Sequence, residues 1–400
     1  MSKLRILHLF NNYLPPTMNW AYNLMEHLPD TLCFVTARSF LKNNFYNSRL
    51  QYISNPFSEY HQHFNNLDNK HRYWYFGKIL TKASEFLQLE NKYLIHQIKE
   101  NKIDLLHAHF AYTGCYFSKL ASKTGVPLIV SFYGYDYERL PHTQPIYYKK
   151  YKQLFKEAAQ FICEGPHGVK ILTKMGCPSS KISVVPLGIN TKDIQSYKRS
   201  KSPNQLSLIQ IAAFTEKKGH IYALKAFHKA LKSGEYMHLT MIGKEKHYGG
   251  NIKNNVINYI KNNNLDDKIT ILDSVDYNHL YQYLEDFQVF LHPSCYATDR
   301  DCEGGAPVVL LDAQATGMPV ISTTHCDIPS EVIHGQTGLL SKEKDIDDIA
   351  NNILRFYKMD NTTYLEYCKA ARAHVENEYD VVESAKKMKK IYLHLFNSKK

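Results

Sequence analysis

Short runs of β-branched and apolar residues alternate along the first half of the chain with longer segments in which apolar residues recur at helical spacing. The short runs predict strands at LRILHLF, TLCFVTA, DLLHAHF, PLIVSFYG, FICEG and ISVVPLG. The longer segments predict helices over residues 19–28, 73–99, 114–123 and 145–158. This alternation is typical of a parallel sheet whose strands are connected by crossover helices.

The same alternation restarts after a polar stretch with Pro and Ser, residues 191–204. Strands are predicted there at LSLIQIAAF, HLTMIG, ITILDS, VFLHPS and PVISTT, with helices over 221–233, 251–263, 277–285 and 307–316. We therefore predict an α/β protein with two similar parallel-sheet domains, residues 1–190 and 191–380, and a cleft between them. A last amphipathic helix within residues 381–400 is expected to pack back toward the first domain. Because open α/β sheets bind ligands at the carboxyl ends of their strands, the cleft is the expected binding site.

Composition excludes several classes of protein. The 400 residues, 44% of them hydrophobic, are enough for two globular domains, which excludes a disordered or fibrous chain. The apolar runs are too short to cross a bilayer, and the first residues resemble a strand rather than a signal peptide, so a cytoplasmic location is expected. The eight Cys include no CxxC, which favours reduced thiols over disulfides or a zinc site.

The net charge of +11 lies almost entirely in the first half, where residues 1–190 hold 22 Lys and Arg against 12 Asp and Glu. Such a basic half indicates an anionic partner, which leaves nucleic acid, an acidic lipid surface and a phosphorylated substrate open. Residues 38–82 interleave basic and aromatic side chains. That mixture is typical of a membrane interface or a stacking surface, and equally of a solvated loop with a partly buried helix.

The residues that are most informative about function lie in the segment 301–340. Glu303 precedes Gly304 and Gly305, and Pro307 then opens a helical run. Glycine backbone and free amides therefore meet at a helix amino terminus, which can hold a diphosphate without a metal. Asp312 follows within that helix, where its carboxylate can accept hydrogen bonds from ribose hydroxyls. By itself, this pattern is also compatible with an ordinary turn from strand to helix.

The segment EGGAPVVLLDAQATGMPVIST, followed by IPSEVIHGQTGLL, resembles the signature of the retaining glycosyltransferases of family 4. The resemblance extends over most of the chain through SVVPLGIN, EKKGHIYALKAF, LTMIGKEK, VFLHPS and NEYDVVESAKKMKKIYLHL. It is greatest to the subgroup that builds exopolysaccharides such as colanic acid. The resemblance implies the GT-B fold, in which two Rossmann-like domains face each other across a cleft and the second domain holds most of the nucleotide-sugar donor.

The resemblance also implies roles for individual residues. Glu303 would contact the transferred sugar, Asp312 the ribose, and Lys218 in EKKG the diphosphate, with the adjacent Lys217 as the alternative. The backbone near Val275 would recognise the base. Sugar hydroxyls and phosphates would bind the backbone of Gly304, Gly305, Ala306, Pro307 and Val308.

Three departures from the family pattern affect the donor site. The usual Gly-Arg before EKKG is Ala212-Ala213, so the arginine that commonly partners the lysine is missing. The second acidic residue is Asp312 instead of Glu, and eight residues, where seven are common, separate it from Glu303. The first loop, NNYLPPTMNW, lacks the paired glycines that many relatives have there.

In the first domain, SFYGYD resembles a strand-end motif in which histidine commonly precedes Gly-x-Asp. Tyr133 stands at that histidine position and Asp136 is retained, so both are predicted on the acceptor side. His107 and His109 in DLLHAHF are expected to face the cleft, and His109 is either an acceptor contact or structural. Because the sequence offers no third ligand at a fitting spacing, no metal is expected.

We therefore predict a retaining, metal-independent glycosyltransferase without a cofactor, in which Glu303 and Lys218 serve catalysis. A sugar would move from a UDP- or GDP-sugar to a hydroxyl of a glycan or lipid-linked acceptor in surface polysaccharide biosynthesis. The enzyme would touch the anionic cytoplasmic face of the membrane and bind no nucleic acid. The alternatives are a GT-B nucleotide-sugar epimerase or phosphorylase, and a non-enzymatic anion-binding protein that uses the basic domain.

Overall fold

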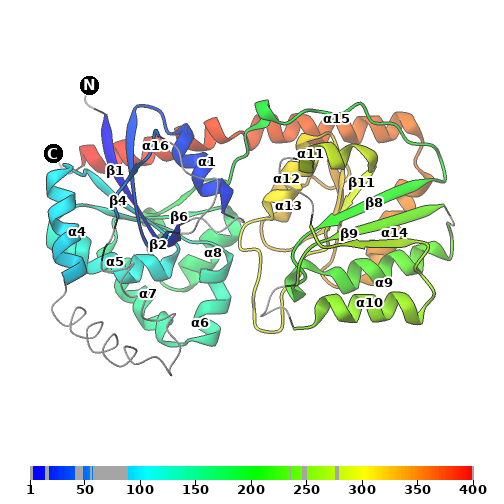
Figure 1. The fold of residues 1–400 in the computed structure, drawn as a ribbon, viewed down its shortest axis with the longest axis horizontal. Coiled ribbons are helices and arrows are strands. Elements are labelled where there is room, and N and C mark those ends of the chain that lie inside the picture. The colour runs from blue at the N-terminus through cyan, green and yellow to red at the C-terminus, as the bar shows by residue number, and fades with distance from the viewer. Residues whose placement is uncertain are drawn as a thin grey trace.

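The computed structural model describes residues 3–13, 18–40, 48–54, 56, 89–234, 236–245, 250–274 and 279–398. The first half of the chain forms a seven-stranded parallel sheet in the order β3-β2-β1-β4-β5-β6-β7 (Figure 1). Its strands are β1 (Leu4–Tyr13), β2 (Thr31–Phe40), β3 (Gln51–Tyr52), β4 (Leu105–His109), β5 (Leu128–Ser131), β6 (Gln160–Cys163) and β7 (Ile182–Val184). Its helices are α1 (Asn19–His27), α4 (Leu89–Glu100), α5 (Ala111–Thr124), α6 (Leu140–Thr143), α7 (Ile146–Glu157) and α8 (Pro166–Lys174).

The second half forms a six-stranded parallel sheet in the order β10-β9-β8-β11-β12-β13. Its strands are β8 (Leu206–Ile211), β9 (Met237–Ile242), β10 (Ile269–Leu272), β11 (Val289–Leu291), β12 (Val320–Thr323) and β13 (Gly338–Ser341). The helices of this half are α9 (His220–Leu231), α10 (Ile252–Asn262), α11 (Leu280–Tyr283), α12 (Val308–Ala315), α13 (Ile328–Glu331), α14 (Ile346–Lys358), α15 (Asn361–Glu378) and α16 (Val381–Asn397). The strand order reverses beside β1 in one sheet and beside β8 in the other, so both sheets are doubly wound and the predicted fold class is confirmed.

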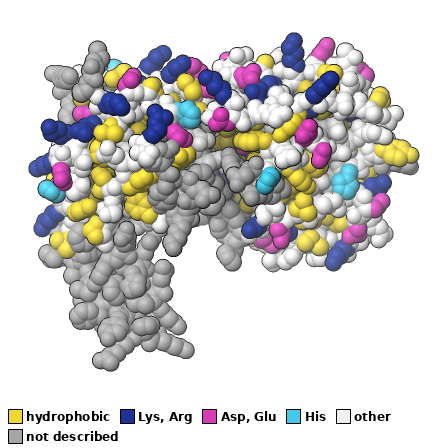
Figure 2. Space-filling view, turned by 45° about the horizontal axis from the view of Figure 1, so that its top comes forward, with side chains coloured by type: hydrophobic (Ala, Val, Ile, Leu, Met, Phe, Trp, Pro, Cys, Tyr) yellow, Lys and Arg dark blue, Asp and Glu magenta, His cyan; other side chains and the backbone are white. Residues whose placement is uncertain are grey.

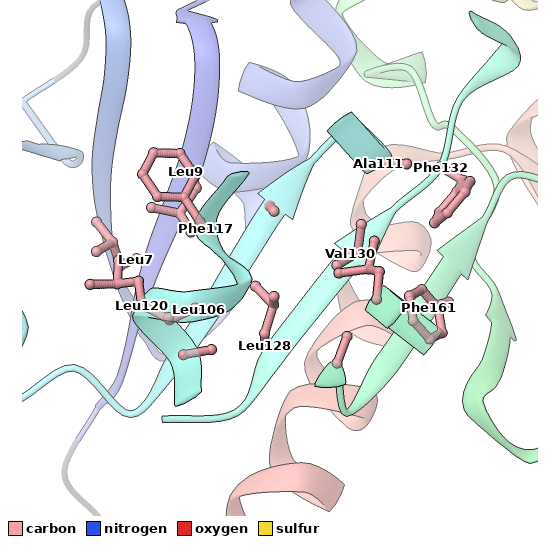
Figure 3. Close-up of a cluster of buried hydrophobic side chains, with 14 of the residues drawn as sticks. Leu7, Leu9, Leu106, Ala111, Phe117, Leu120, Leu128, Val130, Phe132 and Phe161 are labelled. Atoms are coloured by element: carbon pink, nitrogen blue, oxygen red, sulfur yellow. The ribbon is translucent and has the colours of Figure 1, made fainter. Parts of the chain in front are cut away.

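Alternation along β4 places its side chains in two different layers. Leu106 and Ala108 pack in a hydrophobic cluster with α5, in which Phe117 and Leu120 also lie (Figure 3). Leu105 belongs to the cluster on the other side of the sheet, which α1 and α16 cover. The two histidines of β4 alternate with Leu106 and Ala108 and therefore face that second layer.

The chain crosses between the two sheets twice, and the crossings lie together. Ile189 receives a hydrogen bond from the Val381 amide at 2.9 Å and donates one to the Tyr379 carbonyl at 3.0 Å. Gly188 permits this contact, because a Cβ there would lie 2.7 Å from Val381 Cα. Helix α16 then lies on the lobe that holds the N-terminal strands (Figure 1), where Lys389 forms an ion pair with Asp30 at 2.6 Å.

The surface and the cysteines add little to the assignment of function. Basic, acidic and hydrophobic side chains are intermixed over both lobes on the face drawn in Figure 2.

Most of the stretch 38–82, and residues 73–88 of one predicted helix, lie outside the described residues. All eight Cys are free thiols, and six of them are buried. None of the described helices has the length and apolar composition that crossing a membrane requires.

Candidate active site

The loop from Glu303 to Gly305 lies at the amino end of α12 and touches the other domain. Gly304 has a φ of 83°, and a Cβ there would lie 2.2 Å from the Cα of Gly134. A Cβ on Gly134 would in turn lie 2.4 Å from the Glu303 carbonyl oxygen. Only glycine leaves room for this approach. The backbone of the SFYGYD segment therefore contacts the backbone of the EGG segment.

Glu303 and Lys218 form an ion pair at the centre of this loop, with 2.9 Å between Lys218 Nζ and a carboxylate oxygen of Glu303. Ser294 Oγ donates a second hydrogen bond to the Glu303 carboxylate at 2.9 Å. Burial by itself would raise the pKa of the Glu303 carboxyl, but Lys218 and then Lys217 outweigh burial and hold this pKa well below its usual value. Glu303 is therefore ionised and is a weak base.

The two lysines are positioned by a short 3₁₀ turn, Glu216–Lys218, that follows β8. Gly219 ends the turn with a φ of 69° in a place where a Cβ would lie 1.9 Å from the Pro293 carbonyl oxygen. The side chain of Lys217 takes a different direction from that of Lys218, since its Nζ lies 3.2 Å from Asp301 Oδ1 and donates to the Cys302 carbonyl at 2.9 Å. Both lysines thus reach the acidic loop, and Lys218 lies closer to the Glu303 carboxylate, at 2.9 Å against 4.0 Å for Lys217.

Asp312 lies on α12 in a separate cavity of about 220 Å³. Its carboxylate accepts a hydrogen bond from the Tyr281 hydroxyl at 3.0 Å. Burial raises the pKa of Asp312 to about 7. Trp20 and Gly188 of the first domain line the same cavity, so it lies between the domains. Val275, the predicted base contact, lies outside the described residues.

Asp136 is fully buried and its hydrogen bonds go to backbone. One carboxylate oxygen accepts from the Tyr133 amide at 3.1 Å, and the other has no hydrogen-bond partner among the described residues. Burial raises the pKa of Asp136 to about 7, although nearby backbone amides favour the ionised form. An acceptor contact by Asp136 stays a prediction.

His107 and His109 do not face the cleft as we expected, because α16 and α1 cover their side of the sheet. Both are fully buried, and burial holds their pKa values below the usual range of histidine, so both are neutral. His109 Nδ1 is hydrogen-bonded to the Tyr133 hydroxyl at 3.0 Å. Tyr133 is 7% exposed and stacks at an angle on Trp20, so its hydroxyl points into this buried layer.

A third histidine that the sequence analysis missed lies beside them. His8 on β1 pairs in register with His107, and its Nδ1 lies 3.1 Å from His109 Nε2. The three rings offer nitrogens within 4.8 Å of one another, a spacing compatible with a metal ion. However, both ring nitrogens of His107 already bind hydroxyls, and those of His109 bind His8 and Tyr133. Only His8 Nε2 has no partner among the described residues, which fits a hydrogen-bonded network better than a metal centre.

A cavity of about 760 Å³ opens at the carboxyl ends of β1, β4 and β5, as expected for a parallel sheet. Arg139 of the first domain lies on its edge and bonds Asp301 of the second at 3.2 Å and Asp299 at 2.8 Å. Much of the lining is aromatic: Phe10, Phe110, Tyr112, Tyr135 and Tyr147. Spacing along the sequence could not reveal this cavity, because its residues come from separate loops.

Two family models of glycosyltransferases match this chain. The family described as Glycosyl transferases group 1 matches residues 191–374, and the family described as Glycosyltransferase Family 4 matches residues 56–193. The putative colanic acid biosynthesis glycosyltransferase WcaL of Salmonella typhimurium is 30% identical over 284 residues, which are 69% of this chain and 67% of WcaL.

Two more distant proteins extend the comparison. The UDP-Gal:alpha-D-GlcNAc-diphosphoundecaprenol alpha-1,3-galactosyltransferase of Escherichia coli is 22% identical over 86% of this chain and 88% of its own. The structure of Alr3699/HepE of Anabaena in complex with UDP superposes with a TM-score of 0.75 over 97% of this chain and 99% of its own. At 14% sequence identity, this second likeness shows the fold alone.

Proposed function

Because this chain belongs to the glycosyltransferase family that includes the colanic acid biosynthesis glycosyltransferases, we propose that it transfers a sugar from a nucleotide-diphosphate sugar to a hydroxyl of a glycan or lipid-linked acceptor. The pathway would be the biosynthesis of a surface polysaccharide such as exopolysaccharide, capsule or lipopolysaccharide. The observation that carries this proposal is the Lys218–Glu303 ion pair on the Gly304–Gly305 loop, at the amino end of α12.

This arrangement supplies what a nucleotide-sugar donor requires. Free amides at a helix amino terminus and the positive end of the helix dipole favour a diphosphate. When the donor binds, Lys218 would exchange part of its contact with Glu303 for the diphosphate, and the carboxylate of Glu303 would accept hydrogen bonds from the sugar hydroxyls. In its own cavity, Asp312 would hold the ribose.

In the reaction we propose, the bond between the anomeric carbon and the phosphate oxygen breaks, and its electron pair goes to the phosphate. The acceptor oxygen bonds to the same face of that carbon, and its proton passes to the departing phosphate. Lys218 would offset the charge that develops on the leaving group. Neither Glu303, held ionised, nor Tyr133, hydrogen-bonded in the buried layer, is a strong base, which supports retention without a protein base.

The donor is proposed to be a UDP-sugar, since the names of the E. coli relative and of the HepE complex both include UDP. For the acceptor, the cavity of about 760 Å³ has the aromatic lining on which sugar rings pack. The E. coli relative is named for an acceptor on a diphosphate-linked lipid, and an acceptor of that class would bring this enzyme to the cytoplasmic face of the membrane.

A helix beside this cavity is suited to that membrane contact. Tyr147 of α7 lines the cavity, while its neighbours Ile146 and Tyr148 are 54% and 49% exposed. Lys149 and Lys150 follow directly and are exposed. Exposed aromatic and apolar residues next to lysines favour binding to an anionic lipid surface.

A binding experiment with the purified full chain tests the donor. Thermal unfolding is measured with UDP, GDP and ADP and with UDP-glucose, UDP-galactose and UDP-N-acetylglucosamine, with and without magnesium. A ligand of the folded state raises the unfolding midpoint. We expect a rise with the UDP series in either condition, and a smaller rise for Lys218→Ala. A response to none of these nucleotides would contradict the donor site, and NMR of the product anomer would decide between retention and inversion.

A further inference from the structure

Helix α16, at the far end of the sequence, is hydrogen-bonded to the strands of the first domain through a buried polar chain. The Tyr392 hydroxyl lies 2.6 Å from His107 Nδ1, and His107 Nε2 lies 2.8 Å from Ser131 Oγ. The ring of His107 stacks on that of His109 with 4.4 Å between the ring centres, and His109 Nδ1 is hydrogen-bonded to the Tyr133 hydroxyl at 3.0 Å. These contacts connect α16 to Tyr133, the residue before Gly134.

We propose that Tyr392 is a positioning residue for sugar transfer, which acts through His107 and His109 to hold Tyr133. This inference rests on the proposed placement of the transferred sugar beside Glu303. It assigns α16 a part in the active site, although α16 lines neither the cavity of Asp312 nor the cavity of about 760 Å³.

The apolar surroundings of this polar network strengthen its hydrogen bonds and restrict the orientation of its side chains. Tyr392 and His107 are 0% exposed, and they lie in the apolar layer with Met388, Ala385 and Ile129. Hydrogen bonds in such a medium are stronger than in water, and a group left without a partner there is costly. Each member of the chain therefore restricts the orientation of the next.

The Tyr133 end of this polar network lies at the contact between the domains. Tyr133 is followed by Gly134, whose Cα touches Gly304 and whose surroundings include the Glu303 carbonyl. The ring of Tyr133 packs on Trp20 at 4.3 Å, and Trp20 lines the cavity of Asp312. A rotation of the Tyr133 side chain would thus disturb both the backbone that meets Glu303 and the wall of the proposed ribose site.

Two substitutions cut this chain at different points without opening a large cavity. Tyr392→Phe removes only the hydroxyl at the α16 end, and Ser131→Ala removes the hydroxyl that holds the other ring nitrogen of His107. Tyr364→Phe is a matched control, because Tyr364 is also 0% exposed and donates its hydroxyl hydrogen to the Gln288 carbonyl, far from this network. A general loss of stability from a missing hydroxyl would appear in all three variants.

The first readout is independent of activity. Nitrogen-15 NMR of the histidine rings, assigned with His107→Gln and His109→Gln, reports which ring nitrogen carries the proton. We expect Tyr392→Phe to shift the resonances of His109 as well as those of His107, and Tyr364→Phe to shift neither. Unchanged His109 resonances in Tyr392→Phe would overturn the coupling.

The second readout is transfer kinetics with the UDP-sugar that the donor experiment identifies. We expect Tyr392→Phe and Ser131→Ala each to lower kcat about tenfold, the equivalent of one hydrogen bond, with KM for the donor nearly unchanged. The double variant should lose no more than either single variant, because both cut the same chain. Additive losses, or a loss as large in Tyr364→Phe, would overturn the positioning role.

The two readouts also separate this inference from the proposed function. If the His109 resonances shift while Tyr133→Phe transfers sugar normally, the network exists but Tyr133 does not serve the reaction. That result would contradict the positioning role and leave the glycosyltransferase assignment standing.

Discussion

Gly134 and Gly304 bring the two domains into backbone contact, with the Cα of Gly134 only 2.2 Å from where a Cβ of Gly304 would be. Gly134 follows the β5 strand of the first sheet, and Gly304 precedes α12 in the second half of the chain. The contact holds the Glu303 loop against the strand-end loop of the first domain. The proposed sugar site therefore depends on how closely the two glycines approach.

Gly304→Ala should separate the domains and reduce transfer by at least tenfold. An alanine pays about 1–2 kcal/mol for the left-handed backbone and also collides with Gly134. Small-angle scattering should show a larger radius of gyration, and kinetics should show the loss of activity.

Gly335→Ala is the control for this variant. Gly335 has a φ of 78°, but nothing lies within 4 Å of a Cβ there. It should show the backbone destabilisation alone, with compact domains and normal transfer. Equal effects of the two alanines would mean that the contact between the glycines has no special role.

The fold was largely predictable because its strands are apolar runs bounded by turn residues, and doubly wound sheets follow from their alternation with helices. Helix α8 was not predicted, since it starts with Pro166 and contains Gly168, residues typical of turns. Gly168 is required by packing, because a Cβ there would lie 2.5 Å from the Tyr137 hydroxyl oxygen. The short β13 and helices α14 and α15 were likewise missed.

The site was predictable only where its residues are adjacent in the sequence. Glu303 and the glycines form one segment, and Lys218 was found through the resemblance. The contact of Tyr281 with Asp312 and the pairing of His8 with the β4 histidines were not predictable, because strand register and loop packing bring them together. The histidines of β4 were expected in the cleft because they lie at a strand end, but α1 and α16 cover their side of the sheet.

Glu303→Gln should lower transfer by about two to three orders of magnitude, since it removes the charge that orders the donor site. It also leaves Lys218 buried without its partner, which costs about 3–5 kcal/mol of stability. The double variant Glu303→Gln/Lys218→Met should regain much of this stability but no activity. Thermal unfolding and kinetics on the three proteins measure both effects. Normal turnover by Glu303→Gln would contradict the role of the carboxylate.

Asp312 should make the protein less stable as the pH rises. Its pKa is about 7 in the folded state against 3.8 as the ordinary value, so folding favours the protonated form. The contribution of Asp312 to the free energy of unfolding is complete below pH 3.8 and is lost as the pH rises to 7. The free energy of unfolding falls by at most about 1.4 kcal/mol per pH unit over this range. Asp312→Asn should therefore be more stable than the parent above pH 7, and the two should converge near pH 4. Urea unfolding at several pH values tests this, and parallel curves would contradict it.

The ion pairs of Asp301 should hold the domains together at the edge of the large cavity. Its carboxylate bonds Arg139 of the first domain and Lys217 of the second, both at 3.2 Å, with its side chain only 12% exposed. Asp301→Asn should weaken donor and acceptor binding together, about threefold to tenfold in KM, and leave kcat less affected. Asp347→Asn is the control, because that carboxylate pairs with Lys229 at an exposed site within one domain. A similar change in KM in both variants would exclude a role of Asp301 in holding the domains together.

Helix α7 should attach the protein to anionic membranes. Lys149→Glu/Lys150→Glu replaces two positive charges with two negative ones beside the exposed Ile146 and Tyr148, and each lysine by itself contributes about 1 kcal/mol near an anionic surface. Binding to vesicles with phosphatidylglycerol should therefore fall by more than tenfold at low salt. The difference should shrink in 0.5 M salt, because screening already weakens vesicle binding by the parent protein there.

Lys232→Glu, at an exposed site of the second domain, is the control and should bind like the parent. Tyr148→Ser should weaken binding at both salt concentrations, since its ring acts through burial in the interface. If α7 variants and parent co-sediment equally, another surface carries the membrane contact.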